Sequence, residues 1–146
     1  MNKADLLDEL RAEIGVVSDN CHGQIKELYQ FVCKRLYEKV AGYQSVSIYL
    51  TNEYSFFCYI CHGSNALPLV IPFGEEILSL GALHAGVMMK RVGTRLLAVA
   101  PFYRGHQLIG ELVVQGNLQD EMDDEDLSLF HELATLFERK VKESYY

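Results

Sequence analysis

The 146-residue sequence lacks features that several classes of protein require. No apolar run approaches the roughly 20 residues that a helix needs to cross a bilayer, so we expect no membrane-spanning segment. Basic residues are scattered, and 13 Lys and Arg stand against 20 Asp and Glu, which gives a formal net charge of −7. Because nucleic-acid-binding domains present a basic face, this balance argues against a nucleic-acid partner.

The N-terminal stretch, residues 1–14, is acidic and has no continuous apolar region, so it does not resemble a signal peptide. We therefore expect a cytoplasmic protein whose four cysteines stay reduced. The sequence shows no phosphate-binding glycine loop, no nucleophile beside a base and no pair of acid–base carboxylates. The length predicts a single domain over residues 1–146.

Two apolar arms, residues 94–102 and 107–115, predict a central β-hairpin. Gly105 lies in the turn between them, where a positive φ is needed. Apolar residues occur on both faces of the hairpin, and Ile109 and Val113 are expected to share one of them. A hairpin that needs cover on both faces belongs in the middle of a sheet with helices on each side.

Hydrophobic periodicity predicts the other elements. The clearest helix runs from Gln24 to Val40, where apolar residues return every three or four positions. A short helix precedes it and is expected to break at Gly15, and an acidic start and basic end mark a C-terminal helix over residues 123–142. We expect strands at 45–51, 54–61 and 87–91, an extended segment at 67–71 and a pocket helix at 75–85.

This order predicts an α+β fold: a central antiparallel sheet of five to six strands, with the terminal helices on one face and the pocket helix on the other. The order and two short motifs resemble a GAF domain. The motif IPFG, Ile71–Gly74, opens the pocket helix in that family, and the second motif, a proline followed by spaced glycines, runs from Pro101 to Gly110. The resemblance covers about Gln24 to Lys142 and implies a GAF/profilin-like fold.

The GAF resemblance implies a sensor or regulatory domain that binds an unidentified small molecule between the sheet and the pocket helix. Many GAF domains dimerise through their terminal helices. Here Phe31, Leu129 and Leu136 widen the apolar stripes of those helices, so we expect a homodimer. A protein-interaction or dimerisation adaptor of the roadblock or longin type has a similar element order and is the alternative.

One branch of the family is enzymatic. Free methionine-R-sulfoxide reductases carry reactive cysteines on both sides of an IPFG stretch. Residues 66–70 and 75–79 flank that stretch here, and none of them is a cysteine. The loop that supplies a third cysteine in those enzymes is shortened to Met88–Arg91. We therefore expect that this chain is not an enzyme.

Six residues are candidates for binding the ligand. Tyr49 and Tyr59, on adjacent strands, can form a pocket wall with hydroxyl groups, and core aromatics are the alternative reading. Glu111, on the expected face of Ile109 and Val113, either points into the pocket or lies at an exposed sheet position. The other three lie in or beside the expected roof of the pocket: Phe73, His84 (alternatively a solvent-facing loop histidine) and Met88.

Cys58, Cys61 and His62 match the CxxCH pattern of c-type haem attachment. Residues three apart in a regular strand point to opposite faces, so we expect that the two thiols do not converge on one cofactor. A zinc site that added Cys21 would need four tetrahedral ligands, usually from two short-spaced pairs, and the chain has one such pair. We therefore expect no metal and no cofactor.

Overall fold

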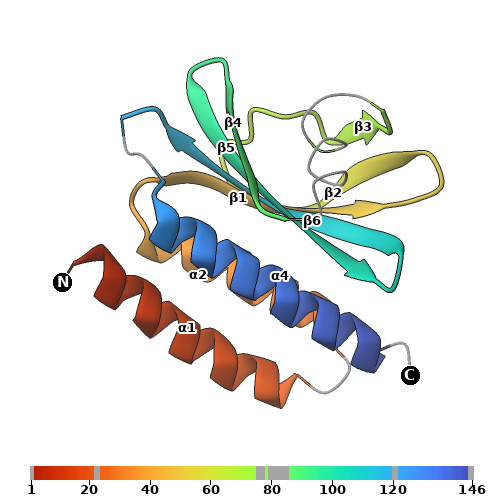
Figure 1. The fold of residues 1–146 in the computed structure, drawn as a ribbon, viewed down its shortest axis with the longest axis horizontal. Coiled ribbons are helices and arrows are strands. Elements are labelled where there is room, and N and C mark those ends of the chain that lie inside the picture. Colours follow the sequence, from red (N-terminus) through yellow and green to blue (C-terminus); the bar gives the residue numbers. More distant parts are fainter. Residues whose placement is uncertain (1, 22–23, 75–77, 79–85, 120–121, 145–146) are drawn as a thin grey trace.

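The computed structural model describes residues 2–21, 24–74, 78, 86–119 and 122–144. These residues form one antiparallel sheet with helices on one of its sides (Figure 1). The helices are α1 (Lys3–Asn20), α2 (Ile25–Lys39) and α4 (Asp124–Ser144). The strands are β1 (Tyr43–Thr51), β2 (Ser55–Gly63), β3 (Val70–Pro72), β4 (Met88–Val92), β5 (Arg95–Arg104) and β6 (Gln107–Asn117).

The six strands lie in the order β3-β2-β1-β6-β5-β4, and every neighbouring pair is antiparallel. The expected hairpin is β5–β6, with Gly105 at φ +62° in its turn. Helices α2 and α4 pack on one face, and α1 runs alongside them on the side away from the sheet (Figure 1). The predicted α+β class and sheet are therefore confirmed. None of the described helices is long and apolar enough to cross a membrane.

The core between the sheet and the helices is held by aromatic rings from three elements. Tyr29 of α2, Phe102 of β5 and Phe137 of α4 form a triangle with centroid distances of 5.1, 5.2 and 5.7 Å. All three side chains are at least 98% buried, and Phe102 and Phe137 are completely so. Because such rings bury large apolar areas, this contact holds α2 and α4 against the β5–β6 hairpin.

We call the opposite side of the sheet the far face. Its buried hydrophobic side chains include Tyr49, Phe56, Ile71, Leu97, Val99 and Val113. Leu78 is helical, fully buried and packed in this cluster. The rest of the expected pocket helix, 75–77 and 79–85, lies outside the described residues.

Helix α1 does not break at Gly15, as the sequence predicted, but continues to Asn20. Its start is capped by Asn2, whose side-chain oxygen accepts a hydrogen bond from the Asp5 amide at 2.9 Å. The buried residues of the helix extend on both sides of Gly15, from Leu7 to Ser18. Packing against α2 and α4 therefore outweighs the roughly 1 kcal/mol that one glycine costs a helix.

A β-bulge in β2 decides which of its side chains reach the far face. Ile48 pairs with Ile60, but the next residue, Tyr49, pairs with Cys58, so Tyr59 is the extra residue. Cys58 therefore lies beside Tyr49 on the far face. Tyr59 turns to the helix side instead.

A second bulge, in β6, shifts the faces of the central hairpin. Phe102 pairs with Gly110 and Tyr103 pairs with Leu108, so Ile109 is the extra residue. Leu108 packs on the far-face cluster, and Ile109 packs on the helix-side core. Ile109 and Val113 therefore do not share a face, as the sequence predicted, because an extra residue reverses the alternation of a strand.

The two glycines Gly110 and Gly15 are expected to respond oppositely to alanine. A Cβ at Gly110 would lie 2.5 Å from the Tyr49 carbonyl oxygen and 2.8 Å from Phe102 Cζ. Gly110→Ala is therefore expected to lower the free energy of unfolding by about 1–3 kcal/mol. At Gly15 nothing lies within 4 Å, so Gly15→Ala is expected to raise it by about 0.4–1 kcal/mol. Urea unfolding measures both, and a Gly110→Ala protein as stable as the parent would contradict the packing described.

Candidate functional site

The candidate site is built around Glu111 on the far face. In β6 this residue lies between Tyr49 of β1 and Pro101 of β5, its two cross-strand partners. Its side chain is completely buried, and neither carboxylate oxygen has a hydrogen-bond partner within the described residues. The alternative reading, an exposed sheet position, is therefore excluded for this residue.

Burial raises the pKa of Glu111 to about 9. The cause is loss of solvation, which penalises the charged form of a carboxyl group. At neutral pH the group is therefore a neutral carboxylic acid that can donate one hydrogen bond and accept others. A buried polar group without a partner costs free energy, which makes Glu111 a candidate ligand-binding group among the described residues of the far face.

The hydroxyl of Tyr49 takes part in a polar network that holds the loop after β2. Tyr49 Oη donates to the Pro68 carbonyl at 2.8 Å and accepts from Asn65 Nδ2 at 2.9 Å. Asn65 Oδ1 accepts from Gln115 Nε2 at 2.7 Å, and Gln115 Oε1 accepts from Arg95 Nη1 at 2.8 Å. These hydrogen bonds fix the loop over one end of the far face. Beneath the loop lies the Tyr49 ring, next to its cross-strand partner Glu111. Nothing in the sequence pattern predicts this network.

Phe73 and Met88 lie at opposite edges of the sheet, Phe73 just after the edge strand β3 and Met88 at the start of the edge strand β4. The Phe73 ring meets Phe56 edge-on at 5.0 Å and is 41% exposed. Met88 pairs with Val99 at the other edge of the sheet and is half-buried against the far-face cluster. Both positions suit the rim of a pocket. His84 lies outside the described residues.

Tyr59 does not lie with Tyr49, as expected, because of the bulge in β2. Its ring lies 6.1 Å from that of Tyr29 in α2, and Gln30 donates to its hydroxyl at 3.4 Å. Lys26 Nζ lies 5.3 Å from the ring centroid. Tyr59 therefore belongs to the helix side and is not part of the candidate site.

The same bulge places Cys58 and Cys61 together on the far face. They pair with Tyr49 and Ser47, which are two residues apart in β1 and so point the same way. The expectation of opposite faces was therefore wrong. Burial raises the pKa of Cys58 to about 11, so its thiol is not ionised at neutral pH. His62 lies on the helix side, stacked on a tyrosine of α2.

The four cysteines are free thiols. Among the described residues no group of three or more His, Cys, Asp or Glu side chains is placed to hold a metal ion. In the part of the chain that the structure describes, the far face offers the Glu111 carboxyl group and thiols rather than a set of metal ligands.

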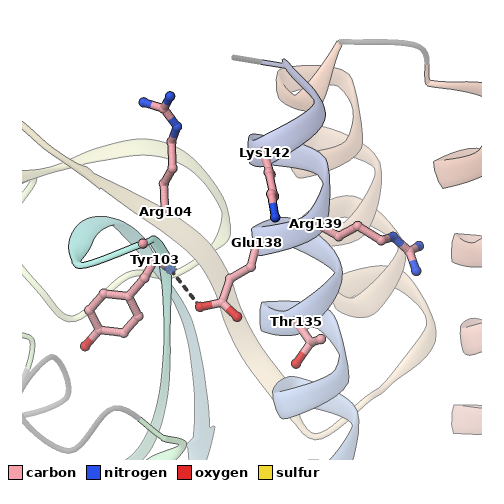
Figure 2. A pocket seen from close by; sticks show the side chains of 7 residues that line it. Tyr103, Arg104, Thr135, Glu138, Arg139 and Lys142 are labelled. Carbon is pink, nitrogen blue, oxygen red and sulfur yellow. Dashed lines mark hydrogen bonds between the residues drawn. The ribbon is translucent and has the colours of Figure 1, made fainter. Parts of the chain in front are cut away.

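A separate cavity of about 630 Å³ lies on the helix side, between the β5–β6 turn and α4. Figure 2 shows Glu138 pointing across it to the backbone of Tyr103, whose amide donates to the carboxylate at 2.9 Å, while Arg139 points away from the hairpin. Basic residues are common at a helix C-terminus because they complement its dipole. The helix dipole thus accounts for the basic residues here, and we place the candidate site on the far face, where the Glu111 carboxyl group lies unpaired among the described residues.

Neither a protein-family model nor a curated protein sequence matches the chain. Several solved structures do match it. A free methionine-R-sulfoxide reductase from Neisseria meningitidis, in complex with its substrate, is 20% identical with a TM-score of 0.86, over 99% of this chain and 93% of that one. A GAF sensor protein from Burkholderia vietnamiensis is 16% identical with a TM-score of 0.86, over all of both chains.

A GAF domain of a phosphoenolpyruvate-protein phosphotransferase from Coxiella burnetii is 15% identical with a TM-score of 0.81, over 99% of this chain and 97% of that one. The reductases among these structures overturn the prediction that this chain is not an enzyme, because enzymes share its fold over nearly the full length. At these identities the likeness establishes the fold, which enzymes and sensors have in common. The chain has a GAF-like fold.

Proposed function

We propose that this domain binds a small organic molecule on the far face and acts as a sensor or regulatory domain. The observation that carries the proposal is Glu111, a completely buried carboxyl group whose two oxygens have no partner within the described residues. Proteins satisfy nearly all buried polar groups, and those left over gather at functional sites. A ligand that hydrogen-bonds or pairs with this group would remove the cost of burying it.

The surroundings of Glu111 suit a small molecule with an apolar body. Val113 and Val99 are fully buried on the same face, and Leu108 packs beside them. Ligand pockets combine such apolar walls with a few polar groups that fix orientation. The loop held by Tyr49 and Asn65 lies at one end of the face and would give a bound ligand a fixed wall.

The solved structures support this use of the fold. The reductase from Neisseria meningitidis was determined in complex with its substrate, so a protein of this fold accommodates a small molecule. We carry over to this chain the capacity to bind a small molecule. A bound compound should also be followed for chemical conversion, since conversion identifies the enzymatic alternative directly.

A thermal-shift screen of amines, amino acids, methionine sulfoxide, oxo-acids and nucleotides tests the proposal. A ligand at one hundred times its dissociation constant adds about 2.7 kcal/mol of stability, which raises the melting temperature of a domain of this size by several degrees. The shift should disappear in Glu111→Gln and persist in Glu53→Gln, which alters an exposed glutamate at the β1–β2 turn. A hit that stabilises both variants equally would place the ligand elsewhere.

A second candidate function, a protein-interaction adaptor, is favoured by the apolar surface around the edge strand β3. Tyr54, Leu69 and Val70 are 78%, 67% and 59% exposed. Exposed apolar side chains gathered at a sheet edge are typical of protein contacts. A screen without any hit on the far face would favour this function over ligand binding.

The homodimer through the terminal helices stays a prediction. Leu129 is fully buried within the chain itself, so it cannot be the contact that was expected. Phe31 and Leu136 are half-buried and keep some apolar surface for a partner. Light scattering at tens of micromolar should show a dimer that Leu136→Glu dissociates. A monomeric parent protein at that concentration would contradict the prediction.

A further inference from the structure

The groups that face Glu111 decide which ligand charge it favours. Among the described residues, the titratable side chains of its face that lie nearest to it are Tyr49 on β1, Cys58 on β2 and Tyr103 on β5, and Cys61 follows further along β2. None of them carries a positive charge at neutral pH. The pKa of Tyr103 is raised by burial and then by the negative potential of Glu111, which places this phenol within electrostatic reach of the carboxyl group.

The basic side chains of the far face lie toward the other end of β5. Arg95 begins that strand and is hydrogen-bonded to Gln115 and to the Ser64 carbonyl. Lys90 pairs with Leu97 near that end, on the exposed edge strand β4. Glu111 pairs with Pro101, which lies further along β5 than Arg95 and than Leu97, the partner of Lys90. No described cation on this face therefore neutralises Glu111.

The rest of its surroundings limits the ligand further. Among the described residues no second acid joins Glu111 in a metal-binding group, and a single carboxyl group makes a poor site for a divalent metal, which takes several oxygen ligands. Leu108, Val99 and Val113 supply apolar surface for an organic body. The chain carries a formal net charge of −7, which attracts cations rather than anions.

We propose that the ligand of the far face is an organic monocation, a protonated amine with an apolar substituent, whose ammonium group pairs with the Glu111 carboxylate. This inference rests on the proposed function and adds the chemical class of the ligand. The ammonium hydrogens supply the donors that the buried carboxyl oxygens lack, and the substituent lies against the valines and leucine of the face.

Pairing with an ammonium group changes the protonation of the protein. In the free protein burial raises the pKa of Glu111 to about 9, so the carboxyl group holds its proton at pH 7. The bound ammonium favours the carboxylate, which releases that proton to the buffer, while the amine keeps its own. One proton is therefore released for each ligand bound, and below the pKa of Glu111 the affinity should rise about tenfold for each pH unit.

Isothermal titration calorimetry on the full chain tests this with n-butylamine, cyclohexylamine and 2-phenylethylamine, each beside the alcohol of the same carbon skeleton. Two buffers of different ionisation enthalpy give the number of protons released. The best amine should bind at least tenfold more tightly than its alcohol, tighten about tenfold between pH 7 and pH 8, and release close to one proton at pH 7. Glu111→Gln should abolish the preference and the proton release. Glu111→Asp should retain proton release, and Glu53→Gln should behave as the parent.

Two results would overturn the amine assignment and leave the proposed function, small-molecule binding on the far face, intact. One is an alcohol that binds as tightly as its amine and loses affinity in Glu111→Gln. The other is amine binding that needs Glu111 but neither tightens between pH 7 and pH 8 nor releases a proton. If no amine or alcohol binds, the amine assignment also fails. The proposed function then fails only if the whole thermal-shift screen is also without a hit.

Discussion

Glu111→Gln is expected to raise the free energy of unfolding at pH 7 by roughly 3 kcal/mol. The pKa of this carboxyl group is about 9 in the folded chain against 4.5 ordinarily. At pH 7 the unfolded chain therefore carries an ionised glutamate that must take up a proton to fold. Glutamine has nearly the same shape and no such requirement, so the cost disappears.

The sign of the pH dependence follows from the same two pKa values. Because burial raises the pKa of Glu111, the folded state holds the proton that the unfolded state releases between about pH 4.5 and pH 9. The contribution of Glu111 is therefore most favourable below about pH 4.5. It falls by about 1.4 kcal/mol for each pH unit until the pH passes the folded pKa.

Urea unfolding of the parent and Glu111→Gln at pH 5, 7 and 8.5 measures this contribution as a difference. The gain in stability should grow steadily with pH. Glu53→Gln, at an exposed turn, should stay within about 0.5 kcal/mol of the parent throughout. A gain from Glu111→Gln that is the same at all three pH values would show that the carboxyl group is not held neutral by burial.

Asp126→Ala is expected to lower the free energy of unfolding by about 2–3 kcal/mol, because it leaves buried hydrogen-bond donors without an acceptor. The Asp126 carboxylate is completely buried in the first turn of α4. One of its oxygens accepts a hydrogen bond from the Tyr43 hydroxyl of β1. The other accepts from the Asp123 amide at 2.8 Å and pairs with the Lys3 ammonium of α1. Alanine would leave the buried Tyr43 hydroxyl without its acceptor and would disconnect three elements.

Asp124→Ala is the matched control for that substitution. Asp124 lies in the same helical turn but is exposed, so its loss should cost about 0.3–1 kcal/mol through the helix dipole alone. Chemical denaturation of both variants measures the difference. An Asp126→Ala protein that unfolds no more easily than Asp124→Ala would contradict the buried cluster.

Most elements of the fold could be predicted from periodicity, because amphipathic patterns report burial directly. The helix expected from Gln24 to Val40 is α2, Ile25–Lys39, and the expected C-terminal helix is α4. The break expected at Gly15 was wrong because local propensity is weak beside packing against two helices.

The candidate site was less predictable because strand faces depend on register. The two bulges each insert one residue, and nothing in a single sequence marks Tyr59 or Ile109 as that residue. The bulges moved Tyr59 away from the far face and brought Cys58 and Cys61 onto one face. Alternation alone placed Glu111 on the face of Val113, where it lies, but its complete burial depends on elements distant in the chain.

Carbon-13 NMR titration of the Glu111 carboxyl group, assigned by its disappearance in Glu111→Gln, tests the account most directly. In the free protein the group is expected to titrate near pH 9. In the presence of a saturating amine from the calorimetric series its pKa should fall below 7, because the bound ammonium stabilises the carboxylate. A pKa near 4.5 in the free protein, or a raised pKa that the bound amine leaves unchanged, would contradict the account.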